Sequence, residues 1–153
     1  MSQRIALRPA RSQDMAACAG IINAWIDETD WLPRVQSPTA IADYYRTTVF
    51  QQRRSFVVTA DGMVMGVMSL SNDGYISALC LGREYRGRGV GTMMLNQAKV
   101  EFGHEVKVWT FEANVLANAF FSKHGFFAIN RTDGDNEEGL PDILMQWFER
   151  VEE

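Results

Sequence analysis

A turn rich in glycine and arginine, between Leu79 and Leu95, is the part of the sequence best suited to chemistry. It reads LCLGREYRGRGVGTMML, a strand end followed by a helix start. Its small residues are Gly87, Gly89 and Gly91, and its cations are Arg83, Arg86 and Arg88. Glycine has no Cβ, so a ligand can approach these backbone amides closely. The N-terminus of a helix also favours an anion, and the turn is therefore predicted to bind phosphate.

The spacing of the glycines narrows the kind of phosphate ligand. A P-loop needs Gly-Lys followed by Ser or Thr, and the sequence has no such motif. A Rossmann turn needs G-x-G-x-x-G; Gly87 and Gly89 fit this pattern, but position 92 is Thr. Glu112 could imitate the ribose-binding acid, so a dinucleotide-dependent enzyme remains an alternative. The form R-x-x-G-x-G, which begins at Arg86, favours a pyrophosphate with more negative charge nearby, as in coenzyme A.

Size and composition limit the classes of protein to which the chain can belong. With 153 residues, of which 46% are hydrophobic, it is expected to form one domain over residues 1–153. The net charge of −4 argues against a nucleic-acid partner. No apolar run is long enough for a membrane span, and Met1 to Arg4 leads into a strand instead of a signal peptide. We therefore expect no membrane partner and a cytoplasmic location.

The two cysteines suggest neither a disulfide nor a metal site. Cys18 and Cys80 show no C-x-x-C spacing and have no histidine cluster beside them. Cys80 is expected to be a small residue of a strand. The sequence therefore predicts no metal ion.

Hydrophobic periodicity predicts a mixed α/β chain. Strands are expected at residues 4–9, 55–60, 63–70, 75–81, 105–111, 126–132 and 143–148. Helices are expected after a Ser12 cap, after the Ser37-Pro38 cap, from Val90 to Phe102, and from Asn114 to Gly125. The order of strand, helix and strand around the glycine turn indicates a parallel pair of strands there.

Two motifs carry a resemblance to a known family. RGRGVG at 86–91 and NVLANAFFSKHGF at 114–126 resemble the GNAT N-acetyltransferase superfamily, and the resemblance extends over nearly the whole chain. The segments WLP at Trp31 and EEGLPD at Glu137 look most like the small-molecule enzymes related to phosphinothricin acetyltransferase. The resemblance implies a mostly antiparallel sheet of about six to seven strands with a splayed parallel pair, flanked by about four helices.

The resemblance also implies a site for acetyl-CoA as co-substrate. Backbone donors between Arg86 and Gly91 would hold the pyrophosphate, and backbone groups of Leu79 and Leu81 would pair with the pantetheine arm. Asn114 looks like the asparagine that family members use near the same arm. The full set of candidate cofactor-binding residues is Leu79, Cys80, Leu81, Arg86, Gly87, Arg88, Gly89, Val90, Gly91, Thr92, Asn114, Phe121 and Lys123. The family often has tyrosine, a general acid, where this chain has Phe121.

The expected reaction is direct attack of an amine on the thioester. The backbone N–H of Leu81 could hold the developing oxyanion. Weak candidates for a catalytic role are Tyr75, Ser77 and Glu137, and the acids Glu28, Asp30 and Glu138 could border the substrate in loops. His104 and His124 are expected to cap helix carbonyls instead of taking part in catalysis.

These observations predict an acetyl-CoA-dependent N-acetyltransferase that acts on the amine of a small molecule or amino-acid-like compound. Asp30 and Trp31 are the candidate substrate-binding residues. The alternatives are a catalytically silent CoA-binding module, a protein or peptide N-acetyltransferase, and the dinucleotide-dependent enzyme named above. The aromatic final strand, with Trp147 and Phe148, could cover a core or the partner in a homodimer.

Overall fold

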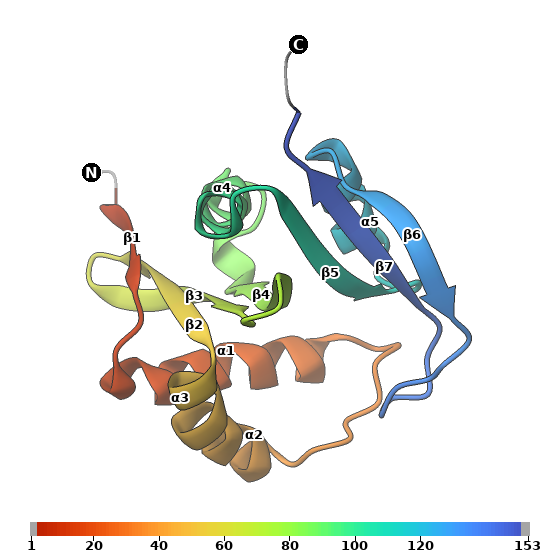
Figure 1. Cartoon of the computed structure of the whole chain (residues 1–153). Helices are drawn as coiled ribbons and strands as arrows, with labels where there is room; N and C mark the ends of the chain where they lie inside the picture. The colour runs from red at the N-terminus through yellow and green to blue at the C-terminus, as the bar shows by residue number, and fades with distance from the viewer. Residues whose placement is uncertain (1–2, 151–153) are drawn as a thin grey trace.

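All seven predicted strands form one sheet in the computed structural model, which describes residues 3–150 (Figure 1). The strands are β1 (Ile5–Pro9), β2 (Arg54–Ala60), β3 (Met63–Leu70), β4 (Tyr75–Leu81), β5 (Glu105–Phe111), β6 (Phe127–Thr132) and β7 (Asp142–Phe148). Their order in the sheet is β1-β2-β3-β4-β5-β7-β6. Every pair is antiparallel except β4 with β5, as predicted.

The helices lie on both faces of this sheet. They are α1 (Met15–Glu28), α2 (Pro38–Tyr44), α3 (Phe50–Gln52), α4 (Val90–Phe102) and α5 (Val115–Lys123). A π-helical turn, η2 (Tyr45–Val49), connects α2 to α3. Figure 1 shows α1 and α2 on one side of the strands and α4 and α5 on the other. The mixed α/β fold with its single parallel pair is therefore confirmed.

Alternation along the central strands explains the two hydrophobic cores. On β2, Val57 packs under α1 while Val58 packs under α4, and Val67 and Met68 of β3 divide in the same way. Successive strand residues point to opposite faces of a sheet, so a sheet covered on both faces needs apolar residues at every position. Phe56, Val57 and Val58 of β2, and Val67 and Met68 of β3, meet this requirement.

Local signals set most helix boundaries where they were predicted. The Ser37 hydroxyl accepts the Ala40 amide at 3.1 Å, and Asn114 caps α5 through the Ala117 amide at 3.2 Å. Gly125 follows α5 with a φ of +88°, the left-handed conformation that favours glycine.

The predicted Ser12 cap is wrong. Ser12 begins a short 3₁₀ turn, η1 (Ser12–Asp14), and Asp14 accepts the amide of Arg11 at 2.7 Å. Two hydrogen bonds from Arg8 hold the Asp14 carboxylate at this position, at 2.7 and 3.0 Å. The helix start therefore depends on a contact with β1 that precedes it.

The aromatic residues of the final strand have different environments. Trp147 packs against the core, whereas Phe148 is exposed, and a homodimer remains a prediction. Within residues 3–150, no helix is long and apolar enough to cross a membrane. In the same range, no three His, Cys, Asp or Glu side chains are grouped so as to hold a metal ion.

Candidate functional site

The site lies where β4 and β5 separate. The two strands are paired only at Tyr75 with Lys107 and at Ile76 with Val108. Ser77 follows directly and is the extra residue of a β-bulge, because Ile76 and Ala78 pair with consecutive residues of β3. A bulge bends its strand and increases its twist. We attribute the separation of β4 from β5 to this bulge.

One edge of β4 is free beyond the bulge. The Gly82 amide, one residue past the strand, donates to the Met65 carbonyl at 2.8 Å, so it faces β3. Backbone groups alternate between the two edges of a strand, and Leu79 and Leu81 therefore turn their N–H groups toward the gap. These are the two residues predicted to pair with an extended ligand.

The glycine turn leads from this free edge to the start of α4. Gly87 and Gly89 have φ values of +75° and +82°, and a Cβ at either position would meet nothing within 4 Å. The first hydrogen bond of α4 runs from the Met93 amide to Gly89. Among residues 3–150, no acceptor faces the amides between Gly89 and Thr92. Four backbone donors without a partner at the start of a helix suit a diphosphate.

Gly91 has a different role from its two neighbours. It lies within α4 without a positive φ, and an added Cβ would lie 3.3 Å from the Phe120 ring of α5. Next to it, the Thr92 hydroxyl contacts Nε2 of His124 at 3.1 Å. Small side chains on α4 thus let α5 approach, and this places Asn114 and Phe121 beside the gap.

The predicted capping roles of the histidines are wrong. The His124 ring contacts Thr92 of α4 instead of a helix carbonyl. Its pKa is lowered by burial and by the charge of Lys99, so the ring is neutral at pH 7. His104 is almost fully exposed and faces Glu149, with 3.4 Å between Nδ1 and Oε2. His104 lies after the end of α4. His124, by contrast, connects α5 to α4 through Thr92.

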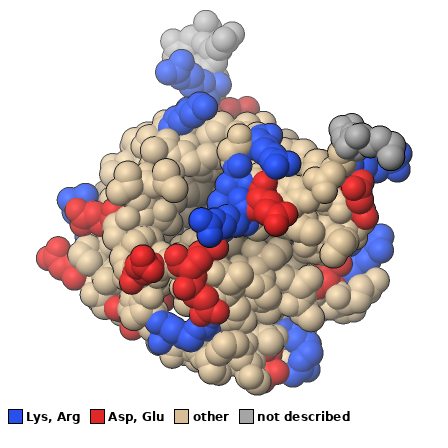
Figure 2. All heavy atoms as spheres, turned by 180° about the vertical axis from the view of Figure 1, so that it is seen from behind, with Lys and Arg blue, Asp and Glu red and all other residues tan. Residues whose placement is uncertain are grey.

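Arg86 is turned toward the end of β4. Its guanidinium donates to the Leu81 carbonyl at 3.0 and 3.1 Å and forms an ion pair with Glu28 at 2.5 Å. Arg88 instead stacks 5.5 Å from the Tyr85 ring, and Lys123 is exposed at the end of α5. In Figure 2, basic and acidic side chains lie next to one another beside a hollow in this face of the molecule. Glu28, expected in a loop, is the last residue of α1.

A cavity of about 470 Å³ fills the gap and continues toward α1 and α2. Residues Ser77 to Cys80 of β4 line one wall, and Asn114 and Phe121 of α5 line another. Phe121 is 5% exposed and packs against Phe120 and Phe126. As a phenylalanine it offers the cavity no hydroxyl. Burial raises the pKa of the Cys80 thiol to about 12. This thiol is neutral at pH 7 and is a poor nucleophile.

The candidate catalytic residues are only partly brought together. Ser77 and Glu137 line the cavity, but the Ser77 hydroxyl donates to the Ser69 carbonyl at 3.0 Å. Tyr75 lies at the closed end of the strand pair, where Lys107 stacks on its ring at 4.7 Å. The exposed Asp30 does not line the cavity. Trp31 does not line it either, and lies edge-on to Trp25 and to Phe111.

Several cavity residues were not predicted as part of a site. They include Trp25, Tyr44, Tyr45, Trp109 and Phe111. Trp25 continues a stripe at helical spacing with Met15 and Cys18, which are buried, and such a stripe is typical of a core. The stripe extends beyond the sheet and over the gap, and hydrophobic periodicity cannot distinguish these two environments.

Comparison with known proteins identifies the family. A family model described as an acetyltransferase (GNAT) domain matches residues 31–148. The chain belongs to the GNAT acetyltransferase family. The predictions of a GNAT N-acetyltransferase, and of acetyl-CoA as its co-substrate, are therefore confirmed.

Individual relatives agree with this placement. The peptidyl-lysine N-acetyltransferase YiaC of Escherichia coli K12 is 22% identical over 148 residues, which cover 92% of this chain and 95% of YiaC. A GCN5-related N-acetyltransferase from Rhodopseudomonas palustris is 25% identical with a TM-score of 0.78, and 97% and 98% of the two chains are covered.

Two more solved structures share the fold. YncA from Salmonella typhimurium, solved with acetyl-CoA, has a TM-score of 0.75 at 17% identity, with 98% of each chain covered. A protein provisionally assigned as a phosphinothricin N-acetyltransferase has a TM-score of 0.76 at 18% identity, covering 95% of this chain and 98% of its own.

Proposed function

We propose that the chain transfers the acetyl group of acetyl-CoA to the amine of a small molecule, and that the gap between β4 and β5 holds the donor. The observation that carries this proposal is the free edge of β4, which is followed in the chain by the glycine turn and by the unpaired amides at the start of α4. An extended amide-containing arm can add to the edge as a strand would, and a diphosphate can follow on the helix start. The two surfaces are contiguous in the order that coenzyme A requires.

The backbone amides of the site then have defined tasks. The amides between Gly89 and Thr92 would donate to the diphosphate, and the Leu79 and Leu81 N–H groups would face the arm. The thioester supplies an acetyl carbonyl whose oxygen becomes negative during attack, and a backbone N–H on the free edge of β4, where Leu79 lines the cavity, would stabilise that charge. Because the Cys80 thiol is neutral, direct transfer to the amine is favoured over an acetylated cysteine.

A lysine side chain of a protein is the second candidate acceptor. The similarity to YiaC, a peptidyl-lysine N-acetyltransferase, supports it over nearly the full length of both chains. A lysine side chain and a small primary amine require the same attack geometry, so the donor site is common to both candidates.

Calorimetric titration with acetyl-CoA and with NAD tests the donor site. We expect acetyl-CoA to bind and NAD not to bind. Arg86→Ala should weaken acetyl-CoA binding by about 10-fold or more if its guanidinium contacts the diphosphate, because charge-assisted hydrogen bonds contribute about 1.5–3 kcal/mol. Unchanged affinity in this variant would count against the role of Arg86.

A matched control separates this effect from a general loss of positive charge. Arg54 of β2 also forms an ion pair with a carboxylate, that of Glu101 on α4, but this pair lies away from the gap. Arg54→Ala should therefore leave the affinity for acetyl-CoA unchanged. Tight binding of NAD, or no binding of acetyl-CoA to the folded protein, would refute the proposal itself.

A further inference from the structure

The acceptor half of the cavity has aromatic and apolar walls. It is bounded by α1, the segment 29–37, α2 and β5, which contribute Trp25, Leu32, Val35, Tyr44, Trp109 and Phe111. Trp31 holds two of these rings in place, with centroids 6.4 Å from Trp25 and 5.7 Å from Phe111, both edge-on. Aromatic rings in the wall of a cavity favour a ligand with a flat, apolar body that can pack against them.

The charges that face this cavity are all negative. Glu137 and Glu138, from the loop between β6 and β7, are its two charged lining residues. Of the residues that the structure describes, no lysine, arginine or histidine lines it. An ammonium group would be attracted to the cavity mouth, whereas a carboxylate would be repelled and would lose water without gaining a cationic partner.

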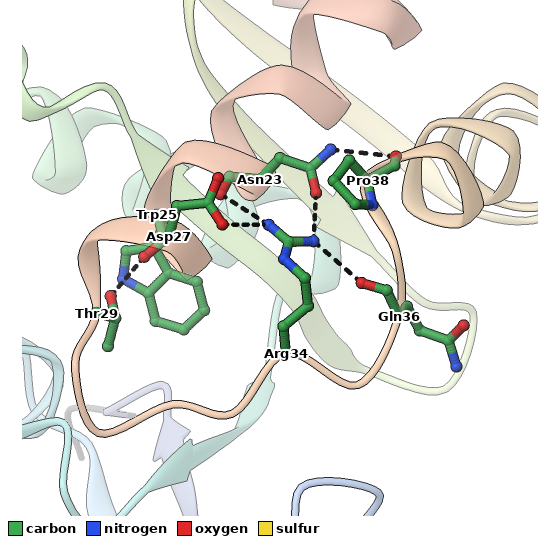
Figure 3. Close-up of polar contacts among 7 residues, drawn as sticks. All are labelled: Asn23, Trp25, Asp27, Thr29, Arg34, Gln36 and Pro38. Atoms are coloured by element: carbon green, nitrogen blue, oxygen red, sulfur yellow. Dashed lines mark hydrogen bonds and ion pairs between the residues drawn. The ribbon is translucent and has the colours of Figure 1, made fainter.

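The cation of the segment 29–37 is engaged elsewhere. Figure 3 shows the Arg34 guanidinium enclosed by its partners. It donates to the Asp27 carboxylate at 2.7 Å, to the Asn23 side chain at 2.9 Å, and to the Gln36 and Asn23 carbonyls at 3.0 and 3.2 Å. These bonds tie the segment to α1, so Arg34 cannot turn to an acceptor carboxylate without releasing a wall of the cavity.

We propose that the acetyl acceptor is a primary amine on an aromatic body that carries no carboxylate, an arylalkylamine in chemical class. This inference rests on the proposed function and narrows its acceptor, because it excludes amino acids. The aromatic walls pack against the body, and their ring faces with the two glutamates attract the ammonium form.

The reaction then balances without a further reactant. The neutral amine nitrogen forms the C–N bond to the acetyl carbon, and the C–S bond breaks. The electron pair of the C–S bond leaves with the CoA sulfur. The amine enters as an ammonium ion and gives one proton to water before attack and a second after it, and the thiolate takes up one proton. The products are the N-acetylated amine, free CoA thiol and one released proton.

Two matched pairs of compounds test the inference by the rate of thiol release. Phenethylamine and L-phenylalanine differ by one carboxylate, as do tryptamine and L-tryptophan. We expect kcat/KM to be at least about 100-fold higher for each amine, because the cavity offers a carboxylate no cationic partner and two nearby glutamates. An amino acid used as well as its amine would overturn the inference. So would a lysine-containing peptide used better than phenethylamine.

A charge reversal provides a second readout that loss of stability would not produce. Glu138→Arg should reduce the preference for phenethylamine over L-phenylalanine by about 10-fold or more, through a lower KM for the amino acid. Asp133→Arg is the matched control: this exposed acid belongs to the same loop but does not line the cavity, so the preference should not change. An unchanged preference in Glu138→Arg would contradict the inference.

Calorimetry with acetyl-CoA on the same samples distinguishes the two levels of failure. If acetyl-CoA does not bind, the proposed function fails. If it binds and the thiol is released with peptides or amino acids only, the donor site stands and the arylalkylamine inference is wrong.

Discussion

Glu28→Gln is expected to tighten the binding of acetyl-CoA, although it removes an ion pair from the protein. The Arg86 guanidinium contacts the Glu28 carboxylate at 2.5 Å and also donates to the Leu81 carbonyl. If this guanidinium moves to the diphosphate when acetyl-CoA binds, its bond to Glu28 must break. The ion pair therefore opposes binding, and neutralising Glu28 removes that opposition.

The size of the effect follows from the exposure of the two groups. The side chains of Arg86 and Glu28 are 41% and 27% exposed, so solvent screens the pair. Ion pairs of this kind contribute about 0.5–1 kcal/mol, which corresponds to about 2- to 5-fold in Kd. The gain should shrink at high salt, where the wild-type pair is already weakened.

Calorimetric titration of both proteins at low and high salt measures this difference. Asp27→Asn is the control, since it removes the same charge one residue away but from an acid that pairs with Arg34. It should leave the Kd unchanged. Weaker binding in Glu28→Gln would refute the reasoning and show that the ion pair prepares the site. An equal gain in affinity in Asp27→Asn would show that the effect comes from the change in net charge alone.

Three further changes test other parts of the structure. Hydrogen bonds from Arg8 lower the pKa of Asp14 and outweigh burial, which acts in the opposite direction, so the pair stabilises the fold above about pH 4 and this contribution is lost as pH falls through the lowered pKa. Asp14→Asn should cost about 2–3 kcal/mol in urea unfolding at pH 7 and less at pH 3; an equal cost at both would contradict this. Gly89→Ala should lower the free energy of unfolding by about 1 kcal/mol because φ is +82°. Gly20→Ala, in α1 with open space around it, should raise the free energy of unfolding by about 0.5–1 kcal/mol. If thermal unfolding showed that both variants change stability in the same direction, the conformational role given to Gly89 would be wrong. Phe121→Tyr should raise kcat by up to about 30-fold at pH 7 by protonating the thiolate, and the gain should disappear near pH 9.5; a gain independent of pH would exclude this role.

Local chemistry explains why so many elements could be predicted from the sequence. Ser37 followed by Pro38, Asn114, and Gly125 act on amides or carbonyls a few residues away, so their meaning does not depend on the rest of the chain. Ser12 failed because the start of α1 is controlled by Arg8 of β1, a contact that no capping pattern contains.

The glycine turn belongs to the same predictable group, but the partners of its arginines do not. Positive φ at Gly87 and Gly89 is a property of the backbone, and the sequence pattern was sufficient to propose an anion site there. Arg86, by contrast, is held by Glu28 from a distant helix. The partners of a side chain depend on which residues lie near it in space, and the spacing of residues along the chain does not predict those partners.

The sequence by itself determined the secondary structure, the parallel pair and the family, because periodicity, caps and glycine spacing act over short ranges. Tertiary structure alone decided the shape and charge of the acceptor cavity. Trp25, Tyr44 and Phe111 come from three separate elements, and each is typical of a core in its own segment. They become walls of one cavity because β4 and β5 separate after the bulge at Ser77, and side chains of α1, α2 and β5 then border the gap between the two strands.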